Sequence, residues 1–325
     1  MLKRIDAFDI NFVDSAASKD FKLKNSTGIG EKRIYIGHDE QRYDDFFEFN
    51  NIEYVFSYKS DLLKYLDEVK EEYYNPIQEY KEDLSLLYSK KYKETESITS
   101  EIIKYSFKKT YDKQHRYYLV LDIEKNSEFN KNYNYIRNIS VPRVTKFCFI
   151  KLIDVSTNKK YIYMRPIYFN RLIGKEDTLE EMTGEIDEKT VNETKKKGRL
   201  KQQLYRQKLI TEMPFCIFTY VTDDRLLQAC HIKPHRVCED SEKYDYKNGI
   251  TMTPTYHVLF DLGFISFKDN GELMVSPFLT NRNRELLNLK SGKSYRLQSG
   301  SEKYLKYHRE KIFCNANMID LNEDN

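Results

Sequence analysis

Apolar residues recur at helical spacing in the first third of the chain. Leu62, Leu66 and Val69 predict a packing helix over about 61–75, which a proline at position 76 ends. We predict a second helix over about 77–92 and a third from about residue 97. Packing against a core explains this pattern, and an arm that clasps a partner or DNA is the alternative.

Between these segments the pattern favours strands. A short strand is expected over 33–37, and a hairpin that turns at Asn50 and Asn51 is expected over 46–58. Residues 115–170 look like sheet, because their apolar positions are rich in β-branched and aromatic residues. The expected strands there are 116–123, 145–155 and 159–169, with a hairpin turn over 156–160.

The charge pattern changes abruptly near residue 195. Residues 175–194 are mostly acidic, whereas 195–209 hold seven Lys or Arg and no acid. We therefore predict two domains, 1–194 and 195–325. The second would open with a basic helix that follows the DNA backbone, and a solvated connector helix is the alternative. The DNA-contacting candidates on it are Lys195, Lys196, Lys197, Arg199, Lys201 and Arg206.

Composition sets broad limits on the protein class. The 325 residues are 40% hydrophobic, which suffices for a sizeable core, and the net charge of +3 excludes a uniformly basic protein. No 18-residue apolar run predicts a membrane span, and the N-terminal segment does not look like a signal peptide. The five Cys lack paired spacing, so no disulfide framework is expected and a reduced cytoplasm is the natural setting.

Three of the six histidines lie between positions 229 and 261. We expect strands over 215–220 and 226–232, the second ending near His231. A turn at Asn248 and Gly249 then leads into a strand over 250–253. A helix should follow from Pro254, with Thr253 as its cap and Gly263 after its end. His257 and Asp261 are four residues apart on it and so share a face.

Three motifs in this region carry a family resemblance: "LLQACHIKP" (226–234), "KNGITMTP" (247–254) and "YHVLFDLGFISF" (256–267). Together they resemble the HNH endonucleases, whose site is called ββα-metal. The closest pattern is a restriction-endonuclease-like subgroup with the signature AxHIKP…NG…HxxFDxGxISF. Weaker similarity continues to "YLKYHREKIF" (304–313), so the resemblance covers roughly 205–315. It implies an α+β protein: a mixed helix and sheet recognition domain, then a ββα-metal nuclease domain.

The resemblance also implies roles for individual residues. His231 would take a proton from the attacking water, which suits an imidazole with a near-neutral pKa. Asn248 would orient that imidazole or the loop around it. His257 would be a ligand for a single Mg2+ or Mn2+ ion that polarises the phosphate and stabilises the leaving oxygen. The implied products carry a 5′ phosphate and a 3′ hydroxyl.

One position departs from the common HNH pattern. Many members have an acidic metal ligand directly before the first His, and here that position is Cys230. A thiol is a poor ligand for a hard cation, although members of this subgroup commonly have a small residue there. Asp261 is our first choice for the second metal ligand, with Asp223 or Asp224 as alternatives. A carboxylate that merely bonds backbone at the helix end is the other interpretation of Asp261.

The remaining candidates have weaker patterns. Lys233 and His235 could contact a phosphate, and a surface position on the loop is the alternative for His235. His308 is interpreted as structural. The cysteines at 216, 230 and 238 lack the spacing of a zinc site, so they are expected to pack in the core.

The layout suggests a metal-dependent endonuclease that cuts double-stranded DNA. A Type II restriction enzyme, possibly of the IIS kind, would use residues 1–194 for recognition. It would cut as a homodimer on DNA and be linked to a cognate methyltransferase. The main alternative is a phage-defence effector whose N-terminal region senses a ligand and whose cutting is unspecific. A DNA-binding protein with an inactive HNH module is a further alternative.

Overall fold

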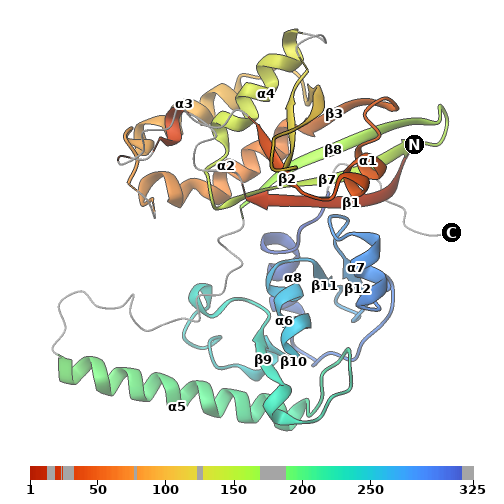
Figure 1. Cartoon of the computed structure of the whole chain (residues 1–325). Helices are drawn as coiled ribbons and strands as arrows, with labels where there is room; N and C mark the ends of the chain where they lie inside the picture. Colours follow the sequence, from red (N-terminus) through yellow and green to blue (C-terminus); the bar gives the residue numbers. More distant parts are fainter. Residues whose placement is uncertain are drawn as a thin grey trace. The chain divides into compact units, whose positions relative to one another are not determined.

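The chain forms two compact units in a computed structural model that describes residues 1–12, 19–22, 24, 33–76, 79–122, 127–168 and 188–316. The N-terminal unit consists of Met1–Asn170 with Pro277–Asn283 and Ala316–Asn325. The C-terminal unit consists of Arg171–Ser276 with Arg284–Asn315. Helices and strands occur in both, so the fold is mixed α and β (Figure 1).

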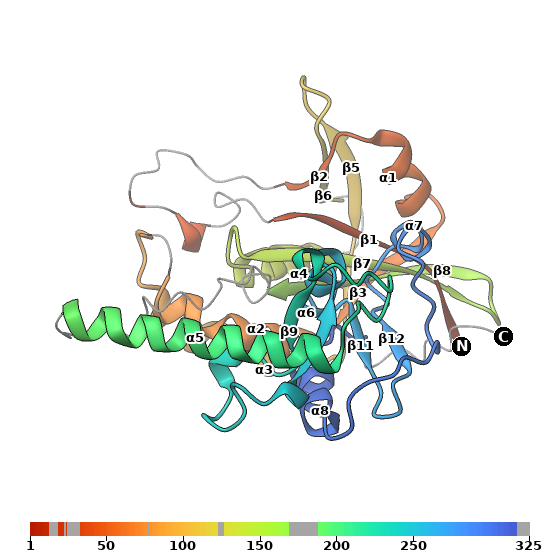
Figure 2. The same ribbon diagram turned by 90° about the horizontal axis from the view of Figure 1, so that it is seen from below.

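Two sheets form the frame of the N-terminal unit. The five-stranded sheet has the order β1-β7-β8-β3-β4, in which β3 and β8 are parallel and the other neighbours antiparallel. A second sheet has the antiparallel order β2-β6-β5, and Figure 2 shows these three strands side by side. The strands are β1 (Leu2–Phe12), β2 (Ile34–Gly37), β3 (Ile52–Tyr58), β4 (Ile102–Tyr105), β5 (Phe107–Tyr111), β6 (Tyr117–Leu121), β7 (Thr145–Asp154) and β8 (Lys159–Tyr168).

Helices of this unit pack on the larger sheet. The contacts of α2 are with β8 and β3, and those of α4 are with β4. The helix predicted over 61–75 is confirmed as α2, whose buried side chains recur at helical spacing from Leu62 to Tyr73. The helices of the unit are η1 (Lys19–Phe21), α1 (Glu40–Phe47), α2 (Lys59–Tyr74), α3 (Leu84–Glu96) and α4 (Ser127–Ile139).

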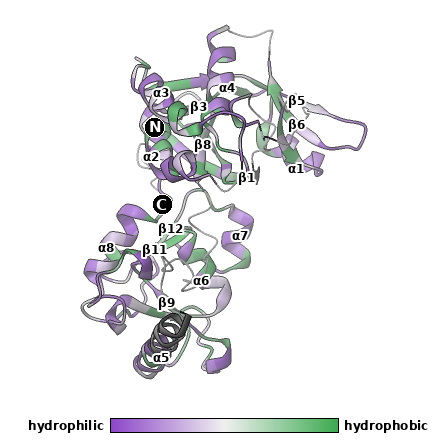
Figure 3. Cartoon of the chain, turned by 90° about the vertical axis from the view of Figure 1, so that its left-hand side faces the viewer, coloured by the Kyte–Doolittle hydropathy of each residue, from purple (hydrophilic) through white to green (hydrophobic). Residues whose placement is uncertain are grey.

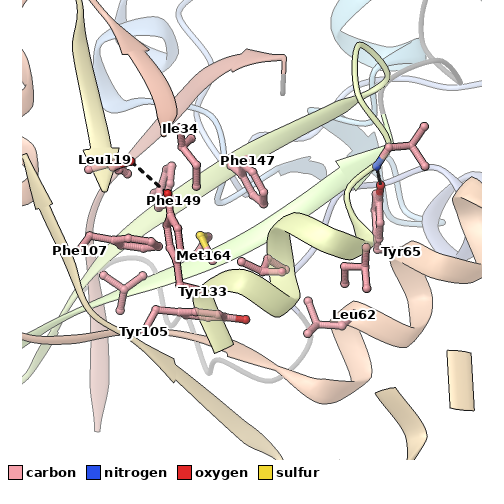
Figure 4. Packing of buried hydrophobic residues seen from close by; sticks show 14 of the residues in the cluster. Ile34, Leu62, Tyr65, Tyr105, Phe107, Leu119, Tyr133, Phe147, Phe149 and Met164 are labelled. Atoms are coloured by element: carbon pink, nitrogen blue, oxygen red, sulfur yellow. Dashed lines mark hydrogen bonds between the residues drawn. The ribbon is translucent and has the colours of Figure 1, made fainter. Parts of the chain in front are cut away.

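The core of the N-terminal unit is strongly aromatic. Figure 4 shows Tyr105, Phe107, Tyr133 and Phe149 in one packed cluster, with Met164 among them. The buried Tyr65 keeps a partner for its hydroxyl, because Tyr65 Oη accepts a hydrogen bond from the Val141 amide at 2.9 Å. Such pairing removes the cost of burying a polar atom, so tyrosine serves here as a core residue.

The strands expected at 33–37, 145–155 and 159–169 are confirmed, as is the turn between the last two. Within that turn Asn158 has a positive φ of 57° and its amide bonds the Asp154 carbonyl. In contrast, the hairpin expected over 46–58 is wrong. Phe46 and Phe47 end α1, because the Asp39 side chain caps that helix at the Arg42 amide and both rings are buried.

Two helix predictions also need correction. The second helix, expected from position 77, is α3 and begins at Leu84, because Asp83 caps it through the Ser85 amide; residues 77 and 78 lie outside the described residues. The third helix, expected from about residue 97, is wrong. That segment forms β4 and β5, where Ile103, Tyr105 and Phe107 are buried in the core at every second position. Helix α4 was not anticipated within the region expected to be sheet.

The C-terminal unit begins with a long helix, α5 (Glu188–Glu212), which packs on the hairpin of β9 and β10 (Figure 1). The strand expected over 215–220 is wrong: Tyr220 has a φ of 59° and its amide bonds the Cys216 carbonyl in a turn. The other elements are η3 (Asp224–Leu226), β9 (Gln228–His231), η4 (His235–Val237), η5 (Tyr246–Asn248), β10 (Gly249–Met252), α6 (Pro254–Asp261), β11 (Ile265–Phe267), β12 (Leu273–Val275), α7 (Asn281–Leu286) and α8 (Glu302–Lys311).

A second core lies beneath α6 and α8. His308 is buried there: its ring stacks on Phe260 at 3.8 Å, and its nitrogens bond Ser266 Oγ and the Phe260 carbonyl. Burial lowers the pKa of His308 to about 3, so the ring is neutral at physiological pH and acts as a structural residue. Figure 3 shows apolar colour on strands such as β12 and polar colour on most of α7 and α8.

Within the part of the chain that the structure describes, every helix is too short or too polar to span a lipid bilayer.

Candidate active site

His231 is the last residue of β9, near the end of the predicted strand, and Tyr205 and Lys243 are among the residues that hold its ring. The ring stacks on Tyr205 of α5, with centroids 4.5 Å apart and planes 12° apart. Nε2 lies 2.9 Å from the Lys243 carbonyl oxygen. Because a carbonyl can only accept, Nε2 carries the hydrogen in the neutral ring and Nδ1 keeps the basic lone pair.

Asn248 is fully buried and fixes the loop that follows His231 rather than the imidazole itself. Its Oδ1 accepts from the Lys233 amide at 2.8 Å, and its Nδ2 donates to the Lys233 carbonyl at 3.1 Å. Nδ2 also lies 3.2 Å from Cys238 Sγ and 3.4 Å from the Glu242 carbonyl. Of the two family roles, orienting the imidazole or the loop, the contacts favour the loop.

The loop is further tied by an ion pair. Lys233 Nζ lies 2.5 Å from Glu242 Oε2, with side-chain exposures of 17% and 15%. Their hydrogen bond raises the pKa of Lys233 and lowers that of Glu242, so both stay charged. The His235 ring packs between His231 and Tyr244, with centroids 5.6 and 5.7 Å away. The structure therefore gives Lys233 and His235 local packing partners, and a phosphate contact stays a prediction.

The structure brings His257 and Asp261 together on α6. His257 Nε2 lies 3.0 Å from Asp261 Oδ2, and the two side chains are 27% and 39% exposed. His257 Nδ1 lies 2.5 Å from Gln228 Oε1, on the first residue of β9. Gln228 and His231 are three residues apart on β9 and so point to opposite faces of the strand: Gln228 reaches α6, and His231 reaches α5.

The donor set fits a hard or borderline divalent cation. Two ligands at right angles around an ion, each about 2.1 Å from it, would lie roughly 3.0 Å apart, which is the separation of His257 Nε2 and Asp261 Oδ2. Among the described residues no third His, Cys, Asp or Glu completes a cluster with them. Mg2+ commonly keeps several waters and binds through one or two protein ligands, so this small set suffices.

Asp223, one of the two alternative ligands named from the sequence, is otherwise engaged. Asp223 Oδ2 pairs with Arg225 Nη2 at 2.6 Å, and Asp223 caps η3. Cys230 is completely buried, and burial raises the pKa of its thiol well above the usual value, with the nearby Asp261 charge adding to the effect. The thiol stays neutral, so it supplies no anionic ligand. Cys216 and Cys238 are likewise buried.

Helix α5 contributes to the site, although its DNA contacts stay a prediction. Arg206 donates to the carbonyls of Leu227 and Asp224 at 2.7 and 2.5 Å, and thereby ties α5 to η3. Lys201 Nζ lies 5.5 Å from the centre of the Tyr244 ring. For the remaining basic candidates the described structure covers the helical backbone and not the side chains; these are Lys195, Lys196, Lys197 and Arg199.

The strand, loop, strand and helix that carry these side chains follow one another between Gln228 and Asp261. Residues 216–268 match the model of the HNH endonuclease family. The matched HNH segment includes His231, Asn248, His257 and Asp261, and it supports a nuclease domain in the C-terminal region. No curated protein matches the chain.

Three residues that hold the HNH site were not predicted from the sequence. Tyr205 lies on α5, before the matched segment; it stacks on His231, and its Oη donates to the Asn248 carbonyl at 3.0 Å. Gln228 and the Lys243 carbonyl bond the two histidines. Of these three residues, only Gln228 lies within one of the motifs that carry the family resemblance, "LLQACHIKP".

Proposed function

We propose that the protein is a metal-dependent DNA endonuclease that cleaves phosphodiester bonds through its HNH domain. The observation that carries this proposal is the pair of His257 and Asp261 on α6, which share one face at 3.0 Å beside the strand that ends at His231. Such hydrolysis requires two metal ligands and a general base. The imidazole and carboxylate on α6 would be the ligands, and the imidazole at the end of β9 would be the base.

In the proposed mechanism, His231 Nδ1 accepts a proton from the attacking water. Donation from Nε2–H to the Lys243 carbonyl keeps the lone pair on Nδ1 and fixes the ring plane, as does stacking on Tyr205. Asn248 holds the loop from Lys233 to Glu242, and therefore the approach to the imidazole, in one geometry. The divalent cation, Mg2+ or Mn2+, would be held by His257 and Asp261 and would stabilise charge on the phosphate and the leaving oxygen.

We further propose that the N-terminal unit selects the target on double-stranded DNA, as in a Type II restriction enzyme. Support for this step is that the chain has a second compact unit, with its own core, in addition to the unit that contains the HNH domain. A nuclease domain of this size contacts few bases, so specificity would come from a second unit. Cutting both strands requires two active sites or two visits, which favours a homodimer on DNA and, for a restriction enzyme, a cognate methyltransferase to protect the host.

A cleavage assay tests this function. Wild type and His231→Ala would be incubated with unmethylated phage DNA and Mg2+, and the fragment ends would be sequenced. Discrete fragments that share one motif and vanish in the variant are expected. A smear that vanishes in the variant would retain the nuclease and replace the restriction enzyme by an effector with unspecific cutting. Equal cleavage by His231→Ala would refute the assignment of the base.

A further inference from the structure

Gln228 is the residue that places the His257 ring. We propose that Gln228 is a positioning residue that sets the tautomer of His257, so that Nε2 presents a lone pair to a divalent cation beside Asp261. This inference rests on the proposed metal-dependent function and adds a residue to it. The contact itself is the 2.5 Å approach of Gln228 Oε1 to His257 Nδ1.

The chemistry of the three groups leads to this role. Gln228 Oε1 can only accept, so the hydrogen of the neutral imidazole lies on Nδ1 and the lone pair lies on Nε2. That lone pair faces Asp261 Oδ2, another acceptor, at 3.0 Å. Two acceptors at this distance need a positive group between them: a proton supplies it in the metal-free protein, and a divalent cation would take its place in the loaded site. Histidines that bind metals commonly donate their other N–H to an oxygen in this manner.

The backbone explains why Gln228 can hold this position. It is the first residue of β9 and pairs with Met252 of β10, directly before α6 begins at Pro254. The strand register therefore fixes Gln228 relative to the start of the helix that carries His257. Glutamine offers both an acceptor and a donor, so the amide oxygen must face the ring for the metal-ready tautomer to form.

Two variants separate an acceptor role from general packing. Gln228→Leu keeps a side chain of similar size but removes the acceptor, and Gln228→Glu keeps an acceptor that cannot donate. Gln203→Leu, at an exposed position on α5, is the matched control. All would be studied as the full chain, with thermal unfolding by circular dichroism to confirm that each variant is folded.

The first readout is the tautomer of His257, measured by nitrogen-15 NMR on histidine-labelled protein at pH 8 in the presence of Mg2+. The His257 signals would be assigned by their loss in His257→Gln. Wild type and Gln228→Glu should show hydrogen on Nδ1, and Gln228→Leu should lose this preference. Hydrogen on Nε2 in wild type, or an unchanged tautomer in Gln228→Leu, would overturn the inference.

The second readout is Mn2+ binding by calorimetry. We expect Gln228→Leu to bind Mn2+ about 10- to 100-fold more weakly than wild type, with Gln228→Glu and Gln203→Leu retaining affinity. Equal Mn2+ affinity in wild type and Gln228→Leu would overturn the role of Gln228 while leaving the endonuclease intact. Wild type that neither binds Mn2+ nor cuts DNA would instead overturn the metal-dependent function, and with it this inference.

Discussion

Replacing Asn248 by Ala should loosen the loop after His231 without unfolding the domain. The change removes the 2.8 Å bond from the Lys233 amide and the 3.1 Å bond to the Lys233 carbonyl. A lost hydrogen bond costs about 1 kcal/mol, and a donor left unsatisfied in a buried place costs about 1–3 kcal/mol. The expected loss is therefore about 2–4 kcal/mol of unfolding free energy, against a total of roughly 5–15 kcal/mol for a typical protein.

Urea unfolding followed by circular dichroism measures this loss, and DNA cleavage under native conditions measures its effect on function. Cleavage should fall further than the fraction of folded protein does, because the loop also includes the Lys243 carbonyl that holds His231. Asn248→Asp is the isosteric test: it keeps an acceptor for the Lys233 amide but turns an oxygen toward the Lys233 and Glu242 carbonyls. It should be at least as destabilising as the alanine variant.

The exposed residue Asn283 provides the control, since Asn283→Ala removes the same side chain without a buried amide. An Asn248→Ala protein that is as stable and as active as the Asn283→Ala protein would refute the reasoning. So would an Asn248→Asp protein with wild-type stability, because the side-chain amide would then have no donor role.

Three further predictions concern the same unit. Because burial lowers the pKa of His308 to about 3, the unfolded chain binds a proton below pH ~6.5 that the folded chain does not. The unfolding free energy should therefore be full above that pH and fall by about 2 kcal/mol between pH 7 and 5. Urea unfolding at each pH measures this slope, and His308→Leu should flatten it. Gly263→Ala should lower the melting temperature more than Gly292→Ala. Both glycines have positive φ, but only at Gly263 would a Cβ meet backbone, namely the Ile312 carbonyl oxygen at 2.2 Å. Equal losses of melting temperature would show that the backbone strain from positive φ alone matters. Tyr205→Phe should lower the unfolding free energy by about 1 kcal/mol, because it removes the hydroxyl hydrogen bond, and Tyr205→Ala should lower it by about 3–5 kcal/mol in the same assay. Only Tyr205→Ala should abolish cleavage, because the phenyl ring of Tyr205→Phe keeps its stack on His231.

Local patterns in the sequence were sufficient for several elements. Helical spacing of buried side chains identified α2, and dense β-branched and aromatic residues identified β7 and β8 with the turn between them. Long motifs placed β10 and α6, whose start at Pro254 and end before Gly263 follow from the conformational limits of those two residues. The pairing of His257 with Asp261 also followed, because four residues make one helical turn.

Our predictions of secondary structure were wrong where a short apolar run is compatible with both a helix and a strand. Phe46 and Phe47 fit a strand as well as a helix, and the Asp39 cap decided for α1. The segment from Ile102 to Tyr111 reads as helix in isolation, but pairing of β4 with β3 and of β5 with β6 made it sheet. Such choices depend on partners that are distant in the chain, which a local pattern does not contain.

The sequence by itself determined which residues are candidates for the chemistry: it marked His231, His257 and Asp261 by motif and spacing, since residue type and a helical period are local properties. Tertiary structure decided how those residues are held. Lys243 and Tyr205 reach His231 across 12 and 26 positions, and Gln228 reaches His257 across 29. Each ring has two nitrogens and either can carry the hydrogen, so only the acceptor that the fold brings to one of them fixes which nitrogen is basic.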